Sequence, residues 1–548
     1  MNGPGERAAT ALTAPFLLFL GLAVPAALLA AGTGSPGSWH DLLSSPATLR
    51  AIRHTLIAGG ASALLATLLG GAFALLAGLT DLPRRGALSF LFLLLMIIPA
   101  QISVIAWIAL TGPASPVLAP IGLAPRPGAP LPLYGPGGII FLMGVEHAPI
   151  VFLILTAFLR AIPAELLEAA AAAGAGPWRS LWRILAPLSL PALLAALSGA
   201  FAAAIGNFAT PALLGIPGRY LMLTTLIFQL LSGFGPDELG TVTLLSLLLG
   251  LLSLAAVAAE RLLATPVALA PGRPARPFTL GAWRILAETL CWLTLAILLF
   301  LPLAALLATA ATRAYGQHFG FATASLAHFS AVLISEPATR RAFLNSTLLA
   351  AVTAVLLVLL SAAAAHRAEA GSRIAKLSLA VAEIPYVLPG TALGIGCILL
   401  FLRPILGVSL YDTLAILLVA YLMRFTALAR RPVQALLKTL DPAIEDSAAS
   451  LGAPLHTRLA RIALPALAPG LAAGALLVFL AAFSELTVSA LLWSQGNETV
   501  GVMIFNLEQA GEFSTAAALS VLAVAVSLLL LAAAALASRG RTILPWQV

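Results

Sequence analysis

The chain has 548 residues, of which 61% are hydrophobic and only 9% are charged, and its formal net charge is +8. A water-soluble protein carries about 25% charged residues, so this composition excludes an ordinary soluble protein. Two cysteines are too few for a disulfide-based fold, and the 29 Lys and Arg lie in short clusters between apolar runs rather than in a nucleic-acid-binding patch. The composition therefore predicts a polytopic helical membrane protein.

About a dozen apolar runs are long enough to cross a bilayer, which takes about 20 residues as a helix. The first six lie at 9–31, 52–79, 87–110, 139–160, 188–210 and 240–260, and the second six lie at 285–309, 347–365, 377–402, 411–432, 467–492 and 514–537. The first run is expected to remain as an uncleaved span, because its end lacks a convincing small-residue cleavage site. The sequence thus predicts an all-α membrane protein with about 12 transmembrane helices.

A segment rich in Pro and Arg separates the two sets of spans. We therefore expect a first module over 1–263, a linker over 264–283 and a second module over 284–548. If the N-terminus is cytosolic, 21 of the 29 Lys and Arg fall on the cytosolic face, as the positive-inside rule requires. Both termini and the linker are accordingly predicted to be cytosolic.

The two halves share a sequence element at a constant separation of 278 residues. It reads EAAAAAGAGPWRSLWRILAP from Glu168 to Pro187 and DSAASLGAPLHTRLARIALP from Asp446 to Pro465. Each half has an even number of expected spans, so the halves run in the same direction through the membrane and form parallel repeats. Such repeats usually build one pathway at the interface between them.

Each copy of the element predicts a short helix, a turn and an amphipathic return to the membrane. The acidic residue at the start suits a helix N-terminus, and the alanines allow another surface to approach closely. Gly174 and Gly452 then allow a sharp turn before Pro177 and Pro454. Apolar residues interleaved with arginines follow in both halves, as in a helix that returns along a membrane surface.

These two elements resemble the EAA loop of permease subunits of binding-protein-dependent ABC importers. The consensus of that loop is Glu-Ala-Ala, three residues, Gly, nine residues and then Ile-x-Leu-Pro. The first copy departs from it only at Ala186, where Leu is usual, and the second copy has Asp446 and Ser447 in place of Glu and Ala. The spans and their repeat fit a fused pair of six-span permease modules, so the resemblance covers essentially the whole chain.

The resemblance implies the type I importer fold and a loop in each half, at 163–187 and 441–465, that couples the permease to an ATPase. The residues that match the family's loop in the first half are Glu168, Ala169, Ala170, Gly174, Ile184 and Pro187. Those in the second half are Asp446, Ser447, Ala448, Gly452, Ile462, Leu464 and Pro465. In the family the acidic residue contacts the ATPase and the glycine provides the bend.

The resemblance also implies the partners. The sequence contains no G-x-x-x-x-G-K-[ST] phosphate-binding loop, so ATP and Mg²⁺ are expected on a separate cytosolic ABC ATPase, in two copies. A periplasmic binding protein is expected to deliver the substrate. The chain itself is expected to be a multi-pass protein of the bacterial inner membrane, in contact with lipid, with no enzymatic activity, no cofactor, no metal site and no nucleic-acid partner.

Ionisable and polar residues inside spans are costly, which makes them candidates for a substrate pathway. These residues are Glu146, His147, Asn207, Glu383, Arg424 and Glu485. The alternative is that they make polar contacts between helices, such as a Glu–Arg pair. Helices could also break where a pathway narrows, at Ile384–Pro385 and Pro389–Gly390 in the second half and at Ile98–Pro99 in the first half.

The substrate is less well determined. Fused double permeases of this length are typical of the ferric-iron and thiamine groups, with phosphonate and polyamine relatives. The segments 384–390, 484–487 and 496–499 look most like the ferric-iron branch, whereas 207–215 is less typical of it. Ferric iron is the expected cargo, and thiamine, a phosphonate or a polyamine is the alternative.

Two other classes of membrane protein fit the sequence less well. A secondary carrier of the major facilitator superfamily also has 12 spans in two parallel halves, but only the DLPRRG segment at 81–86 weakly matches the signature of that family. A polytopic membrane enzyme would need a constellation of catalytic groups, and the sequence shows none. The duplicated loop favours the importer over both.

Overall fold

The computed structural model describes residues 4–33, 39–126, 128–129, 131–233, 238–263, 278–317, 319–369, 371–404, 407, 409–438 and 442–537. These residues are mostly helical, and the only β-structure among them is two isolated bridges. Residues 264–277 of the expected linker lie outside this described part, and so does residue 441 at the start of the second expected loop.

The described part of the first half contains eleven α-helices, several of them short. They are α1 (Pro4–Thr33), α2 (Trp39–Ser44), α3 (Pro46–Leu79), α4 (Arg85–Ile97), α5 (Ala100–Thr111), α6 (Pro136–Arg160), α7 (Ala164–Ala172), α8 (Pro177–Ser180), α9 (Ala186–Ile205), α10 (Leu223–Ser232) and α11 (Glu238–Leu263). A π-helical segment over Leu181–Leu185 joins α8 to α9, and another follows at Pro211–Gly215.

The described part of the second half follows a similar order. It contains α12 (Arg284–Leu295), α13 (Leu301–Ala310), α14 (Ala327–Ser330), α15 (Pro337–Glu369), α16 (Arg373–Val381), α17 (Ile384–Val387), α18 (Gly390–Phe401), α19 (Leu414–Leu437), α20 (Pro442–Ser450), α21 (Leu455–Arg458), α22 (Leu464–Phe483), α23 (Ser489–Leu492), α24 (Val500–Gln509) and α25 (Phe513–Ala537). A π-helical segment over Leu459–Ala463 joins α21 to α22.

Within the described residues, nine helices are long and apolar enough to cross a membrane, and two bent helix pairs bring the number to eleven. The bent pairs are α4 with α5, at 100°, and the helix over Arg373–Val387 with α18, at 110°. The expected spans 87–110 and 377–402 are therefore broken rather than straight. Pro99 and Pro389 stand at the two breaks, because proline donates no backbone hydrogen bond and forces the preceding residue out of the helical conformation.

The remaining expected span, 411–432, corresponds to α19. This helix is 24 residues long but carries Arg424, Arg430 and Arg431, which make it too charged to rank with the apolar helices. Arg430 donates through Nε to Glu383 at 2.7 Å, and the Arg431 guanidinium lies 5.1 Å from the centre of the Tyr386 ring. Arg430 is thus paired with a carboxylate between helices, which is how membrane-embedded cations are tolerated, whereas Arg431 is exposed.

The sequence repeat is also a repeat of structure. Helices α6, α7, α8 and α9 begin 278 residues before α19, α20, α21 and α22, respectively. The second parts of the broken spans, α5 and α18, have equal lengths and are 290 residues apart. Glu146 in α6 therefore corresponds to Arg424 in α19, and Asn207 corresponds to Glu485.

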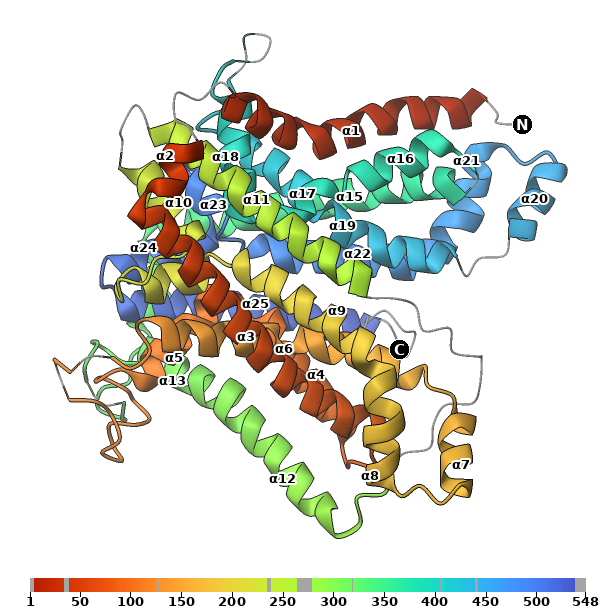
Figure 1. Cartoon of the computed structure of the whole chain (residues 1–548). Coiled ribbons are helices and arrows are strands. Elements are labelled where there is room, and N and C mark those ends of the chain that lie inside the picture. Colours follow the sequence, from red (N-terminus) through yellow and green to blue (C-terminus); the bar gives the residue numbers. More distant parts are fainter. Residues whose placement is uncertain are drawn as a thin grey trace.

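The two halves exchange their first helices. Helix α1 packs mainly against α16 and α18 of the second half, while α13, which continues α12, packs against α5 of the first half as well as against α25. Figure 1 shows α1 along the second-half helices, with α7 and α20 at one end of the molecule and α10 and α24 at the opposite end. We call these the α7/α20 end and the α10/α24 end.

Small residues allow the closest helix contacts. Helices α3 and α6 make the most extensive contact, and a Cβ on Gly70 would lie 2.2 Å from the carbonyl oxygen of Ala148. In the second half, a Cβ on Gly474 would lie 2.9 Å from the carbonyl oxygen of Ala429. Such close backbone approach is how helices associate in lipid, where the hydrophobic effect does not drive one helix onto another.

The DLPRRG segment between α3 and α4 holds the end of the linker. Asp81 donates its backbone N–H to the carbonyl of Phe278 at 3.1 Å, and its Oδ1 accepts from the N–H of Leu280 at 2.9 Å. Arg84 forms an ion pair with Glu288 of α12 at 2.7 Å. These contacts attach the start of the second half to the first half, so this segment has a structural role here.

Candidate functional site

The two duplicated loops, residues 163–187 and 442–465, have the same backbone geometry. Gly174 and Gly452 adopt φ values of +79° and +80°, in the left-handed region that favours glycine. The N–H of Ala175 donates to the Ala170 carbonyl at 2.9 Å, and the N–H of Ala453 donates to the Ala448 carbonyl at 3.0 Å. This is the hydrogen bond of a Schellman helix end, and it produces the sharp turn that the glycines were expected to allow.

Most of the predicted residues of the duplicated loops lie on the surface. In the first loop Glu168, Ala169, Gly174 and Pro187 are exposed, Ile184 is half-buried and Ala170 is buried. In the second loop Ser447, Gly452, Leu464 and Pro465 are exposed, while Ala448 and Ile462 are half-buried. Asp446 belongs to α20, but its side chain lies outside the described part of the structure.

Large apolar side chains are exposed beside the same turns. Trp178 and Trp182 are 72% and 66% exposed, and Leu451 is 89% exposed. Both loops lie at the α7/α20 end (Figure 1). Exposed apolar residues that gather on one face commonly mark a protein or membrane contact.

A polar pair lies within the first half. Asn207, which follows α9, donates through Nδ2 to Oε2 of Glu146 in α6 at 2.9 Å. The Oδ1 atom of Asn207 accepts from the backbone N–H of Thr210 at 3.2 Å. Asn207 therefore both pairs with Glu146 and caps the turn that leads into the π-helical segment after α9.

The corresponding pair in the second half has different chemistry. Glu485 accepts from the N–H of Val488 at 2.9 Å, from the N–H of Ser489 at 3.0 Å and from the Ser489 hydroxyl at 2.8 Å. Glu485 thus caps α23 in the same way that Asn207 caps its turn. Arg424 Nε lies 3.8 Å from Glu485 Oε1, which is an ion pair rather than a hydrogen bond.

The structure thus joins four of the six pathway candidates into two related pairs. Glu383 pairs instead with Arg430, which lies about one and a half helical turns after Arg424 in α19. His147 is 6% exposed, and its Nδ1 atom has no hydrogen-bond partner among the described residues.

The broken spans bring the two halves together near these pairs. Gln101, in the first turn of α5, donates through Nε2 to the carbonyl of Ser484 in the second half at 2.7 Å. In the corresponding place of the other half, a Cβ on Gly206 would lie 3.7 Å from Cβ of Pro389. Sequence reasoning missed Gln101, although its position after the Pro99 break was a usable signal.

Aromatic side chains join the halves at the α10/α24 end. The ring of Phe228 in α10 lies 6.0 Å from that of Phe505 in α24, with an interplanar angle of 87°. Phe208, next to Asn207, lies 6.1 Å from Phe505 and 5.1 Å from Phe228. These contacts hold α10 and α24 against each other across the interface between the halves.

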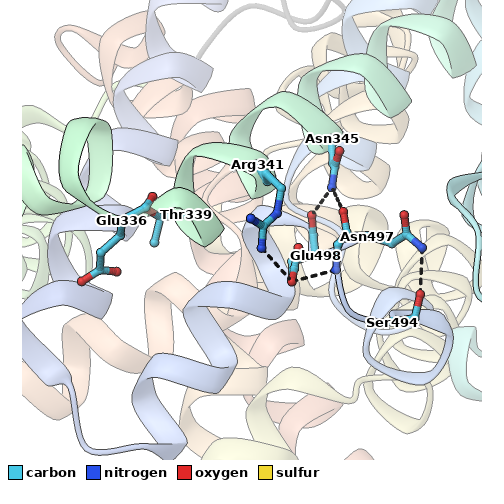
Figure 2. Close-up of polar contacts among 8 residues, drawn as sticks. Glu336, Thr339, Arg341, Asn345, Ser494, Asn497 and Glu498 are labelled. Atoms are coloured by element: carbon cyan, nitrogen blue, oxygen red, sulfur yellow. Dashed lines mark hydrogen bonds and ion pairs between the residues drawn. The ribbon is translucent and has the colours of Figure 1, made fainter.

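The segment before α24 is fixed to α15. Figure 2 shows Asn345 directed at this segment, where its Nδ2 donates to the carbonyls of Gly496 and Glu498 at 3.1 and 3.0 Å. Arg341 forms an ion pair with Glu498 at 3.5 Å (Figure 2). In the first half His54 similarly lies 2.9 Å from the Leu221 carbonyl through Nδ1.

Residues 496–499, which resembled the ferric-iron branch, therefore belong to this attachment of α24. Within the described residues, no group of three or more His, Cys, Asp or Glu lies close enough to hold a metal ion. The structure consequently has two exposed loops at one end, which the repeat relates to each other. Polar and aromatic contacts join the two halves.

Comparison with known proteins places these features in a family. Residues 70–268 and 357–541 match the family described as "Binding-protein-dependent transport system inner membrane component", once in each half. A probable ABC transporter permease protein of Sinorhizobium fredii is 27% identical over 435 residues, which cover 77% of this chain and 75% of the relative.

Shorter similarities connect the chain to permeases named for different cargos. A putative 2-aminoethylphosphonate transport system permease protein of Salmonella paratyphi A is 30% identical over 148 residues, 27% of this chain and 55% of the relative. An Fe(3+)-transport system permease protein of Haemophilus influenzae is 28% identical over 143 residues, 26% of this chain and 28% of the relative. The chain thus spans about half of the first of these relatives and about a quarter of the second.

A solved bacterial alginate ABC transporter, in complex with an alginate pentasaccharide-bound periplasmic protein, has a chain that is 19% identical, with a TM-score of 0.37 over 47% of this chain and 94% of that one. The family match covers most of this chain and occurs once in each half. The chain therefore belongs to the family of binding-protein-dependent transport system inner membrane components, as a fused double ABC transporter permease that spans the bacterial inner membrane several times.

Proposed function

We propose that this chain is the translocation subunit of an ATP-driven importer and that its duplicated loops receive two copies of a separate ABC ATPase. The observation that carries this proposal is the pair of loops, which share one backbone turn and lie at the same end of the molecule. A dimeric ATPase would present two equivalent surfaces, and two equivalent loops would match them.

The α7/α20 end would then face the cytosol. This orientation agrees with the excess of Lys and Arg that the sequence assigns to that face. It places twelve spans, counting both broken helices and α19, between the ATPase and the periplasm. Both termini would be cytosolic, and the chain would contribute no ATP-hydrolysing residue of its own.

The substrate would cross between the halves. The broken spans support this route, since both breaks fall inside expected spans and α5 and α18 bring the first half and the second half together. Non-helical backbone at that depth is tolerated only where it is buried in protein or lines a cavity. Closure of the ATPase would move the duplicated loops and rock the halves, opening the α10/α24 end to a periplasmic binding protein.

The cargo is a separate question from the machinery. Ferric iron is the candidate that the sequence resemblance favours, and a relative is named for Fe(3+) transport. A relative named for 2-aminoethylphosphonate makes phosphonate the second candidate, while thiamine and polyamine rest on the sequence resemblance alone.

Native purification tests the proposal. We would isolate the chain in mild detergent from its own host and weigh the intact complex by mass spectrometry. We expect one chain with two copies of an ATPase that contains a phosphate-binding loop, and uptake in vesicles that stops when ATP is removed. Uptake that follows a proton gradient without ATP would instead establish an ion-coupled carrier.

A further inference from the structure

The first turn of α18, in the second half, has backbone N–H groups and a hydroxyl without hydrogen-bond partners among the described residues. Helix α18 begins at Gly390 after the 110° break, and its N-cap, Pro389, offers no side-chain hydrogen bond. The first N–H groups of a helix have no acceptor within the helix, and none of the described residues supplies one to Gly390 or Thr391. Thr391 is fully buried, and its hydroxyl has no hydrogen-bond partner among the described residues.

A cation lies beside this turn. Nη1 of Arg424 is 2.5 Å from the position that a Cβ on Gly390 would occupy. Arg424 is in the middle of α19, and its side chain is 25% exposed. Its ion-pair partner, Glu485, is 3.8 Å away and already accepts three hydrogen bonds, so the pair does not use up the guanidinium donors.

The first half lacks this arrangement. Ala100 stands where the second half has Gly390, and Glu146 stands where it has Arg424. Gln101, at the position of Thr391, donates to the Ser484 carbonyl. The two broken spans therefore share a fold, but only the second combines a glycine at the helix start, an unpartnered hydroxyl and a neighbouring arginine.

The position of this turn is also suited to a pathway. Pro389 lies against Gly206 of the first half, and α18 packs on α1 and α11, which both belong to that half. A helix N-terminus with free N–H groups and an arginine is the combination that binds phosphate-like and sulfate-like anions. In transporters, the N-terminal ends of broken helices direct such groups at anionic substrates.

We propose that the turn formed by Gly390 and Thr391, together with Arg424, is an anion-binding site on the translocation pathway and that the cargo is a compact oxyanion. This inference rests on the proposed import function and specifies its substrate class. A bare ferric ion would be repelled by Arg424 and by the positive end of α18.

Gly390 is needed because Arg424 and Thr487 fill the space where a side chain would stand. A Cβ there would meet Arg424 Nη1 at 2.5 Å and Thr487 Cγ2 at 2.7 Å, so alanine displaces the guanidinium without removing its charge. Gly390→Ala and Arg424→Gln therefore disrupt the same site in different ways, the first by displacing the guanidinium and the second by removing its charge. Arg424→Lys keeps the charge but loses the planar fork of donors.

The first experiment measures binding to the purified full-length chain in detergent. Thermal unfolding is followed against increasing sulfate and, separately, methylphosphonate, with sodium chloride at matched ionic strength. We expect the oxyanions to raise the unfolding temperature of the wild type, since a ligand that binds the folded state stabilises it. We expect an apparent Kd about tenfold or more higher in Arg424→Gln and Gly390→Ala, and an intermediate value in Arg424→Lys.

Arg126→Gln is the control variant, because it removes the same charge from an exposed arginine outside the site. It is expected to bind like the wild type. No stabilisation of the wild type by either oxyanion, or equal stabilisation of the wild type and Arg424→Gln, would overturn the site.

The second experiment separates this inference from the import function. Uptake of radiolabelled sulfate, methylphosphonate and ferric iron is measured in cells that carry the chain with its own partners, with and without Arg424→Gln. Oxyanion uptake that Arg424→Gln abolishes supports the site. ATP-dependent uptake of ferric iron that Arg424→Gln leaves intact overturns the oxyanion proposal while the import function stands.

Discussion

At the scale of single residues, Glu485 and Asn207 act as caps at corresponding positions of the repeat. Glu485 supplies acceptors to Val488 and Ser489, as Asn207 does to Thr210. Each follows the end of a long apolar helix, where an unpaired buried backbone N–H would cost about 1–3 kcal/mol. The repeat therefore preserves the capping role at a position where the charge differs.

Glu485→Ala should test this role. It removes the acceptor of three hydrogen bonds and leaves Arg424 without its ion-pair partner, so we expect a loss of about 1–3 kcal/mol in stability. Thermal unfolding in detergent measures it. Ser489→Ala, which removes only the hydroxyl, should cost about 1 kcal/mol. A Glu485→Ala variant as stable as the wild type would show that the cap is dispensable.

Asp81 offers a second test, away from the pathway. Its Oδ1 atom accepts from the Leu280 N–H and so attaches the end of the linker to the first half. Asp81→Ala should lower stability by about 1 kcal/mol, whereas Asp81→Asn keeps an acceptor oxygen and should cost less. The unfolding temperatures of the two variants and the wild type are compared in one detergent. Equal losses of stability in both variants would contradict the role of Asp81 Oδ1 as a hydrogen-bond acceptor.

At the scale of elements, the duplicated loops depend on their glycines. Gly174 and Gly452 have left-handed φ, and a Cβ at either would meet nothing within 4 Å. Any other residue there is strained by about 1–2 kcal/mol without a clash, so the turn changes while the spans remain folded. The loops are therefore accessible to mutation separately from the membrane part.

We expect Gly174→Asp combined with Gly452→Asp to abolish uptake, a loss of about tenfold or more, with a normal amount of protein in the membrane. Substrate accumulation and membrane immunoblots measure the two quantities. Gly86→Asp is the matched control, because Gly86 is also exposed with free space around it but lacks a left-handed φ. Normal uptake in the double variant would remove the coupling role from these loops.

At the scale of the whole molecule, the halves are not independent bundles. Helix α1 packs on the second half and α13 on the first, so part of the packing surface of each half is covered only when the other half is present.

If the chain is divided at a point within 264–277, the two halves should therefore assemble when they are expressed together as separate chains. We expect the halves to copurify in equal amounts through an affinity tag on one of them, and each half expressed alone to accumulate several-fold less in the membrane. Quantitative immunoblotting measures both. Equal accumulation of either half alone would mean that the exchanged helices contribute little to stability.

The prediction of spans succeeded where long apolar runs alone decide the structure. Insertion of a helix depends on its own hydropathy, and the duplicated loop could be recognised because its residues are contiguous. The same reasoning did not identify which arginine pairs with Glu383 or that Gln101 reaches Ser484, because the partners lie 383 residues apart in the latter contact.

The sequence by itself determined a helical membrane protein, its internal repeat, the turn in each duplicated loop and the residues at which two spans break, since each follows from local composition or backbone chemistry. Only the tertiary structure decided which polar groups pair, that the first helices are exchanged, and that Arg424 stands over Gly390. Those outcomes depend on contacts between distant segments, which bilayer packing and hydrogen-bond satisfaction select once all the helices are present.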